Sequence, residues 1–203
     1  MLSYQVIEHG KPLQQVFTAA PKPKGTEVLV RITRSGVCHS DLHIWDGYFD
    51  LGGGKRFYVK ERGCIPPFTL GHEPFGVVEA FGPGAAKAMK GLKAGQRRLV
   101  YPWIGCGKCA VCKAGKDNYC VSGSQFLGVN RAGAYSTHVL IPHPRYLVDT
   151  AGVDDAFAST LPFEDIQRSV DIKGRRHALL DAGALLTAES LGVAAPRKGM
   201  MRL

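Results

Sequence analysis

Four closely spaced cysteines constrain this chain more than any other feature of its sequence. They follow the pattern C-x2-C-x2-C-x7-C, with glycines nearby that let the backbone turn tightly, and they are Cys106, Cys109, Cys112 and Cys120. Thiolates at this spacing converge on one tetrahedral ion with metal–sulfur bonds of about 2.3 Å. With all four positions filled by protein, the predicted zinc ion is structural and pins a loop that cannot bury a core of its own.

Two other interpretations of the four cysteines stay open. The bacterial ferredoxin pattern for an iron–sulfur cluster closes with a three-residue gap and a proline, whereas seven residues precede Cys120 here and Val121 follows it. The second alternative is a set of unligated thiols. Disulfides are disfavoured, because the sequence predicts a protein of the reducing cytoplasm.

Length and charge narrow the class of protein. At 203 residues we expect one domain with a tail. The first ten residues do not read as a secretory signal, and no stretch approaches the roughly 18 to 20 apolar residues of a membrane span. The formal net charge is +9, but the Lys and Arg residues are scattered rather than grouped. We therefore predict a soluble cytoplasmic protein without nucleic-acid or membrane partners.

Short runs rich in β-branched or aromatic residues recur along the chain and end at Gly or Pro. Turn residues punctuate them, as in the stretches 21–25, 82–84 and 91–95. Many short strands without long helices favour a mainly β fold, a barrel or a sandwich. The predicted strands are 27–32, 76–81, 98–101, 135–141 and 146–148.

The pattern of short strands and turns stops after about Leu161, where an Ala/Leu/Arg-rich segment begins. A helix over 175–191 is one interpretation, although Gly183 and Gly192 weaken it. Disorder is the other. We therefore predict one domain over 1–161, with a zinc lobe at about 104–122, and an atypical tail over 162–203.

A second group of chemistry-bearing residues lies nearer the N-terminus. Cys38 follows a predicted strand directly, and His72 and Glu73 open another about thirty residues later. Each alone is more often structural. Together they supply thiolate, imidazole and carboxylate, the ligand types of a catalytic zinc site with one exchangeable position.

The string Gly36-Val37-Cys38-His39-Ser40-Asp41, the Gly71-His72-Glu73 motif and the four-cysteine lobe, in that order, resemble one known family. They look like the catalytic domain of the zinc-dependent medium-chain alcohol dehydrogenases, a GroES-like β-barrel. The stretch Gly133-Ala134-Tyr135-Ser136-Thr137-His138 is also similar to a segment of that family. The resemblance covers roughly residues 1 to 160. It implies oxidation of an alcohol or reduction of an aldehyde with NAD(P).

The resemblance assigns roles to individual residues. Cys38 and His72 match ligands of the catalytic zinc, and Glu73 matches a position in or next to its coordination sphere. Zinc in that family acts as a Lewis acid that lowers the pKa of the alcohol. The remaining matches are Ser40 as acceptor of the alcohol proton, His43 as the relay toward solvent, and His39 as a contact to the cofactor pyrophosphate. Asp41 is predicted to support the loop through hydrogen bonds.

The tail of this chain departs from the sequence pattern of the family. The family's further zinc ligand is usually a cysteine, but this chain has none beyond Cys120, and Glu164 or Asp165 is the nearest oxygen substitute. No G-x-G-x-x-G stretch for a nicotinamide cofactor occurs either. We therefore expect a truncated or frame-shifted fragment without a nucleotide-binding domain, with exposed barrel surface that favours oligomers. The functional alternatives are a catalytic domain not competent alone and an inactive zinc-binding β module that only binds a partner.

One segment stays ambiguous at this level. The stretch between Cys38 and His72 is somewhat long for the family, and it holds Cys64 beside the basic and aromatic run 55–60. We expect either an exposed insertion or a surface loop that shapes substrate access. Substrate identity and the choice of NAD or NADP are not encoded in any motif of this chain.

Overall fold

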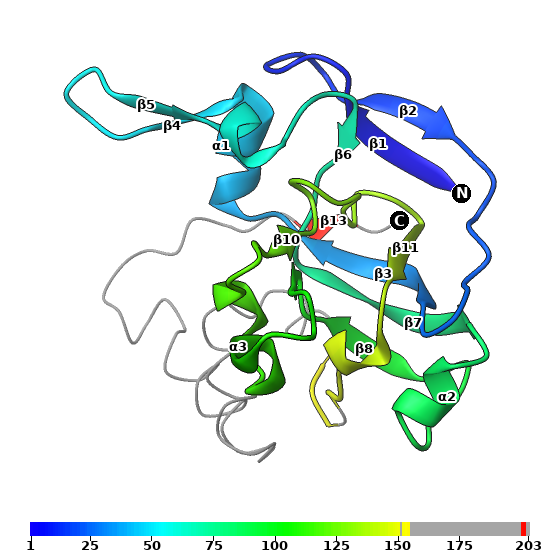
Figure 1. The fold of residues 1–203 in the computed structure, drawn as a ribbon. Helices are drawn as coiled ribbons and strands as arrows, with labels where there is room; N and C mark the ends of the chain where they lie inside the picture. Colours follow the sequence, from blue (N-terminus) through cyan, green and yellow to red (C-terminus); the bar gives the residue numbers. More distant parts are fainter. Residues whose placement is uncertain (151, 155–199, 202–203) are drawn as a thin grey trace.

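Short antiparallel strands form most of the regular secondary structure in this computed structural model, which describes residues 1–150, 152–154 and 200–201 (Figure 1). The strands are β1 (Leu2–Val6), β2 (Gln14–Phe17), β3 (Val28–Gly36), β4 (Tyr48–Asp50), β5 (Arg56–Tyr58), β6 (Phe68–Thr69), β7 (Pro74–Phe81), β8 (Arg97–Val100), β9 (Trp103–Ile104), β10 (Gln125–Phe126), β11 (His138–Ile141), β12 (Leu147–Val148) and β13 (Met200–Met201). The helices are α1 (His39–Asp46), α2 (Ala85–Ala88) and α3 (Ala110–Lys113), with 3-10 turns η1 (Val59–Arg62), η2 (Asp117–Tyr119) and η3 (Pro144–Tyr146). The predicted mainly β class is confirmed.

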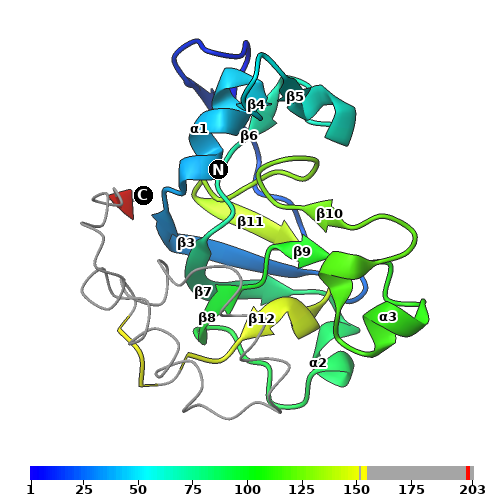
Figure 2. The same cartoon turned by 90° about the vertical axis from the view of Figure 1, so that its left-hand side faces the viewer.

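The largest sheet has the strand order β11-β3-β7-β8-β12, and β13 pairs with the end of β3. A second sheet, β2-β1-β6, is joined to it through the segment that precedes β11. There Tyr4 N–H donates to Tyr135 O at 2.7 Å, and Thr137 N–H donates to Leu2 O at 2.8 Å. β9, β10 and α3 lie together on one side of the large sheet (Figure 2). The two hydrogen bonds therefore connect the second sheet to the large sheet.

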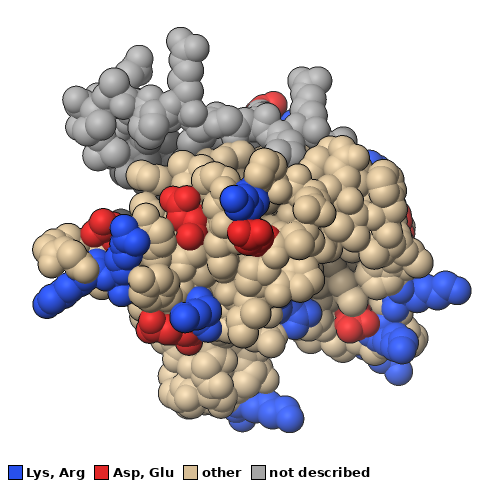
Figure 3. Space-filling view, turned by 90° about the horizontal axis from the view of Figure 1, so that it is seen from above, with Lys and Arg blue, Asp and Glu red and all other residues tan. Residues whose placement is uncertain are grey.

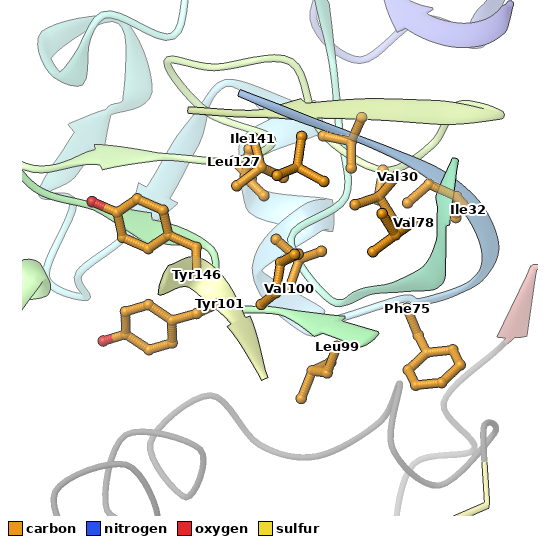
Figure 4. Close-up of a cluster of buried hydrophobic side chains, with 14 of the residues drawn as sticks. Val30, Ile32, Phe75, Val78, Leu99, Val100, Tyr101, Leu127, Ile141 and Tyr146 are labelled. Atoms are coloured by element: carbon orange, nitrogen blue, oxygen red, sulfur yellow. The ribbon is translucent and has the colours of Figure 1, made fainter. Parts of the chain in front are cut away.

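The core follows from the two-residue period of a strand. In β3, Val28, Val30 and Ile32 are buried, whereas Arg31 between them is exposed and pairs with Glu79 at 3.5 Å. Neighbouring segments contribute side chains to the same interior, among them Val78, Val100, Leu127 and Ile141, whereas Phe75 and Leu99 point to the opposite face of the sheet (Figure 4). The apolar faces of β3, β7, β8 and β11 therefore share one core.

Helix α1 and the hairpin that follows it were not expected as regular elements. α1 begins directly after Cys38, and Gly47 ends it with a left-handed φ of 89°. β4 and β5 then form a hairpin that projects from the body of the molecule (Figure 1). The chain returns into a second core cluster in which Cys64 is fully buried beside Ile44 and Val59. Residues 50–56 of this stretch are exposed, as expected of an insertion, whereas Cys64 itself packs in the interior.

The surface agrees with the scattered charge of the sequence. Lys and Arg side chains are interspersed with Asp and Glu on the face drawn in Figure 3 and form no continuous basic patch there. Within the described residues, no helix is long and apolar enough to cross a membrane. The predicted helix over 175–191 and nearly all of the predicted tail lie outside the described residues.

Candidate active site and metal centres

Neighbouring strands bring the three residues of the N-terminal group together. Cys38 follows the end of β3, and His72 and Glu73 stand immediately before β7, which pairs antiparallel with β3. Gly36 N–H donates to Glu73 O at 3.1 Å, which closes the ladder beside them. One donor atom from each of Cys38, His72 and Glu73 lies within 4.8 Å of the others. This cluster, named here the Cys-His-Glu cluster, therefore forms where two central strands meet.

A buried carboxylate, that of Asp41, holds the cluster in shape. Its Oδ2 accepts hydrogen bonds from Cys38 N–H at 3.0 Å and from Tyr135 Oη–H at 3.0 Å. Its Oδ1 lies 3.1 Å from His72 Nδ1. A histidine that gives its Nδ1 proton to a carboxylate presents Nε2 as the free donor, the arrangement usual for metal-bound histidine. The predicted supporting role of Asp41 thus extends from its loop to the imidazole.

Gly71 makes room for this network. Its φ is 96°, and a Cβ at this position would stand 2.6 Å from the ring of Tyr135 and 2.9 Å from Tyr135 N. Only glycine combines that backbone conformation with that close approach. The residue before His72 is therefore fixed by packing against Tyr135.

The first turns of α1 carry the remaining candidates. Ser40 Oγ lies 3.2 Å from Cys38 Sγ and 3.1 Å from His72 Nε2, so its hydroxyl touches the Cys-His-Glu cluster. His43 stands three positions on, on the same side of the helix. Its ring stacks on the exposed His39 with centroids 4.8 Å apart and contacts Phe49 at 4.8 Å. Ser40 therefore touches the cluster, the half-buried His43 lies on the same side of the helix, and His39 stacks on His43 at the exposed surface.

The electrostatics of the cluster favour a cation. The hydrogen bond with His72 lowers the pKa of the Cys38 thiol. Burial alone disfavours the imidazolium of His72, but the hydrogen bonds with Asp41 and Cys38 outweigh burial and raise its pKa to about 10. A divalent ion that takes the place of the His72 proton would lie between a thiolate, a carboxylate and a neutral imidazole, which together carry two negative charges. The donor set therefore fits zinc.

The four cysteines gather around α3 as the sequence predicted for a zinc lobe. Their sulfur atoms lie within 4.8 Å of one another, and Cys106 Sγ is 3.9 Å from Cys112 Sγ. Tetrahedral zinc with bonds of about 2.3 Å needs sulfurs about 3.8 Å apart. Hydrogen bonds from the N–H groups of Lys108 and Cys109 lower the pKa of the Cys106 thiol to about 6. The lobe therefore fits zinc in the spacing of its sulfur atoms and in its four thiol donors.

Asp117 fastens the lobe to the barrel. It is buried and accepts hydrogen bonds from Gly105 N–H at 3.2 Å, from Tyr146 Oη–H at 3.0 Å and from the guanidinium of Arg145. Gly105 lies so close that a Cβ there would stand 2.4 Å from Cys112 Sγ and 2.5 Å from Asp117 Oδ1. The position therefore requires glycine. These supports span 28 or 29 positions of sequence, and no motif signalled them.

The oxygen substitutes for a further zinc ligand, Glu164 and Asp165, lie outside the described residues. Tyr135 is the site residue that sequence reasoning missed. It belongs to a quoted motif, but its contact with Asp41 joins positions 94 residues apart.

Barrel, cysteine lobe and Cys-His-Glu cluster together define a GroES-like domain. Residues 24–151 match the model of the alcohol dehydrogenase GroES-like domain family. The NAD-dependent alcohol dehydrogenase of Sulfurisphaera tokodaii is 40% identical over 147 residues, which cover 72% of this chain and 40% of that protein. The enzyme of the same name from Saccharolobus solfataricus is 38% identical over an equal length, again 40% of that protein. The chain thus spans less than half the length of these relatives.

Solved structures agree. The alcohol dehydrogenase of Aeropyrum pernix superimposes with a TM-score of 0.62 and 26% identity, over 93% of this chain and 45% of the other. A thermostable alcohol dehydrogenase from Pyrobaculum aerophilum gives 0.64 and 29%, over 80% of this chain and 44% of the other. The chain belongs to the alcohol dehydrogenase family and contains its GroES-like domain.

Proposed function

We propose that this chain is the zinc-binding catalytic domain of an NAD(P)-dependent dehydrogenase that oxidises an alcohol or reduces an aldehyde. The observation that carries the proposal is the Cys-His-Glu cluster, whose donors lie within 4.8 Å of one another and in contact with Ser40. Support comes from the two relatives named as NAD-dependent alcohol dehydrogenases. We also propose that the catalytic domain ends at residue 161 and that an atypical tail begins at residue 162.

In this proposal Cys38 and His72 hold the catalytic zinc, with Glu73 in or next to its coordination sphere. Zinc, when bound, supplies Lewis-acid polarisation of the substrate oxygen. Asp41 keeps the Nε2 of His72 directed at the ion and its Nδ1 proton away from it. The cysteines of the lobe hold a second, structural zinc.

In this mechanism the Ser40 hydroxyl accepts the proton of the substrate hydroxyl and gives up its own proton toward His43. Ser40 Oγ already lies within hydrogen-bond distance of two cluster atoms, so a substrate oxygen placed at the cluster reaches the same hydroxyl. His43, half-buried on the next turn of α1, then moves the proton toward solvent, where its stacked partner His39 is exposed. Imidazole suits this step because it titrates near neutral pH.

His39 is also the proposed contact to the pyrophosphate of the cofactor, since its ring is exposed beside the cluster. Residues 1–203 contain no G-x-G-x-x-G turn. We therefore expect these 203 residues alone to bind zinc and an alcohol but to transfer no hydride. An assay with benzyl alcohol and NAD tests this point, and turnover by the purified chain would contradict it.

Zinc content tests the proposal itself. We expect elemental mass spectrometry to find two zinc ions per purified chain. Cys38→Ser should lower this number to one, and Cys106→Ser combined with Cys109→Ser should remove the other ion. Cys64→Ala is the matched control, because its thiol is buried away from both clusters. If the wild-type chain held one zinc ion and Cys38→Ser still held it, the proposed catalytic zinc site would be contradicted. The alternative of an inactive zinc-stabilised module would then be favoured.

A further inference from the structure

A cavity of about 340 Å³ opens beside Ser40, between the projecting hairpin and strands β9 and β10. Aromatic rings line it on two sides. Phe49 and Phe57 of the hairpin have ring centroids 6.4 Å apart, and Trp103 and Phe126 of the two strands have centroids 4.2 Å apart. The ring of Phe126 also lies 5.1 Å from that of His72. A ligand in this cavity therefore lies among flat apolar surfaces and can reach the Cys-His-Glu cluster.

The lining of this cavity carries one formal charge, that of Arg62 at the end of η1. The guanidinium carbon lies 5.7 Å from the centroid of the Phe57 ring. No carboxylate among the described residues forms an ion pair with Arg62, and the lining contains no Asp or Glu. The other polar side chains of the lining, Ser40, Ser124 and Asn130, are neutral. The cavity therefore combines aromatic sides with a positive group that has no carboxylate partner in the part of the chain that the structure describes.

This combination selects among ligand chemistries. Aromatic side chains favour flat rings in stacked or edge-on arrangements. A guanidinium recognises a carboxylate through two parallel hydrogen bonds and repels a cation. A polyhydroxylated ligand would leave most of its hydroxyls against apolar rings, which is unfavourable. An aromatic ligand with a carboxylate matches both features.

We propose that the substrate is an aromatic alcohol or aldehyde that carries a carboxylate, and that Arg62 selects it by pairing with that group. This inference rests on the proposed function, since it places the reacting oxygen at Ser40 and the cluster. Arg62 is exposed, so its pair with the ligand is partly hydrated and modest in strength.

Fluorescence of Trp103 tests the inference without catalysis. The chain has two tryptophans, and Trp45→Phe leaves Trp103, which lines the cavity, as the reporter. Titration of this variant with 4-(hydroxymethyl)benzoate should show binding roughly three- to tenfold tighter than titration with benzyl alcohol. Arg62→Gln should abolish the difference, and Arg62→Lys should restore part of it. Added salt should weaken binding of the carboxylate only.

Arg56→Gln is the control variant. Arg56 lies on the same hairpin with its guanidinium 4.0 Å from the centroid of the Tyr48 ring, outside the cavity lining, so the preference should persist. Equal affinity for the two ligands, no binding of either, or a preference that survives Arg62→Gln would overturn the inference. Zinc content measured on the same samples separates the two failures, because loss of the ion at Cys38 counts against the proposed function and not against the choice of ligand.

Discussion

At the scale of single residues, Asp41 organises more of the site than any proposed metal ligand does. Its carboxylate contacts the backbone of Cys38, the imidazole of His72 and the hydroxyl of Tyr135. It is 2% exposed, so these contacts act in a low-dielectric interior where hydrogen bonds to a charge are strong. The position of two proposed ligands thus depends on one side chain that does not touch the ion.

Asp41→Asn should weaken zinc binding at the Cys-His-Glu cluster by roughly 10- to 100-fold, because the amide supplies no charge to orient His72. Competition with a fluorescent chelator measures this affinity in the zinc-loaded chain. Asp46→Asn is the matched control, since Asp46 is exposed at the end of the same helix. An unchanged affinity in Asp41→Asn would show that His72 needs no such support.

Sequence reasoning found the residues with recognisable chemistry and missed those that act through geometry. Cys38, His72 and Glu73 stand out because thiolate, imidazole and carboxylate are the groups that zinc binds. Tyr135 gave no such signal, because its hydroxyl matters only through a partner 94 positions away. The glycine at 71 was quoted as part of a motif, but its reason, contact with Tyr135, appears only in three dimensions.

At the scale of elements, the cysteine lobe depends on a close approach of backbone to sulfur. Gly105 leaves β9, and its α-carbon faces both Cys112 Sγ and the carboxylate of Asp117. That carboxylate in turn binds Arg145 and Tyr146 of η3. A side chain at residue 105 would therefore disturb the cysteine cluster and its attachment to the barrel at once.

Gly105→Ala should release zinc from the lobe and destabilise the chain by about 1–3 kcal/mol or more, as overpacking does. Metal content and thermal melting measure the two effects. Gly115→Asn is the control in the same lobe, because nothing lies within 4 Å of its Cβ position and its φ of 80° is one that Asn tolerates. Retention of two zinc ions in Gly105→Ala would contradict the packing argument.

The regular strands were predictable, and the elements around the cavity were not. The expected strand at 27–32 is the start of β3, and that at 76–81 lies within β7, because apolar β-branched runs bounded by turns leave few alternatives. α1 is only eight residues long, too short for a clear helical period. Its available signals were Asp41 near its start and Gly47 just after its end.

At the scale of the whole molecule, two core clusters share the apolar side chains. The smaller cluster contains Cys64, whose side chain is fully buried beside Val6 and Leu70. Burial raises the pKa of this thiol to about 12, above its ordinary value of about 8.5. The folded chain therefore keeps the proton at pH values where the unfolded chain releases it, and stability falls as pH rises between the two values.

Ionisation of the Cys64 thiol in the unfolded chain should lower the free energy of unfolding by about 2 kcal/mol between pH 8 and pH 10. Other groups add their own changes over the same range. Urea unfolding of wild type and Cys64→Ala at several pH values measures the contribution of Cys64. The variant should be less stable below pH 8, because it leaves a small cavity. The difference should then shrink by about 2 kcal/mol by pH 10. A difference that stays constant with pH would contradict the burial argument.

The cysteine lobe and the Cys-His-Glu cluster draw their proposed zinc ligands from stretches of chain that differ greatly in length. The lobe takes all four cysteines from the short stretch 106–120, whereas the Cys-His-Glu cluster exists only when β3 and β7 are paired and Tyr135 is in place. A nascent chain leaving the ribosome could capture an ion in the lobe before the barrel closes, but not in the other cluster. Occupancy of the Cys-His-Glu cluster would then mark the point at which the chain has been synthesised beyond Tyr135 and β3 has paired with β7.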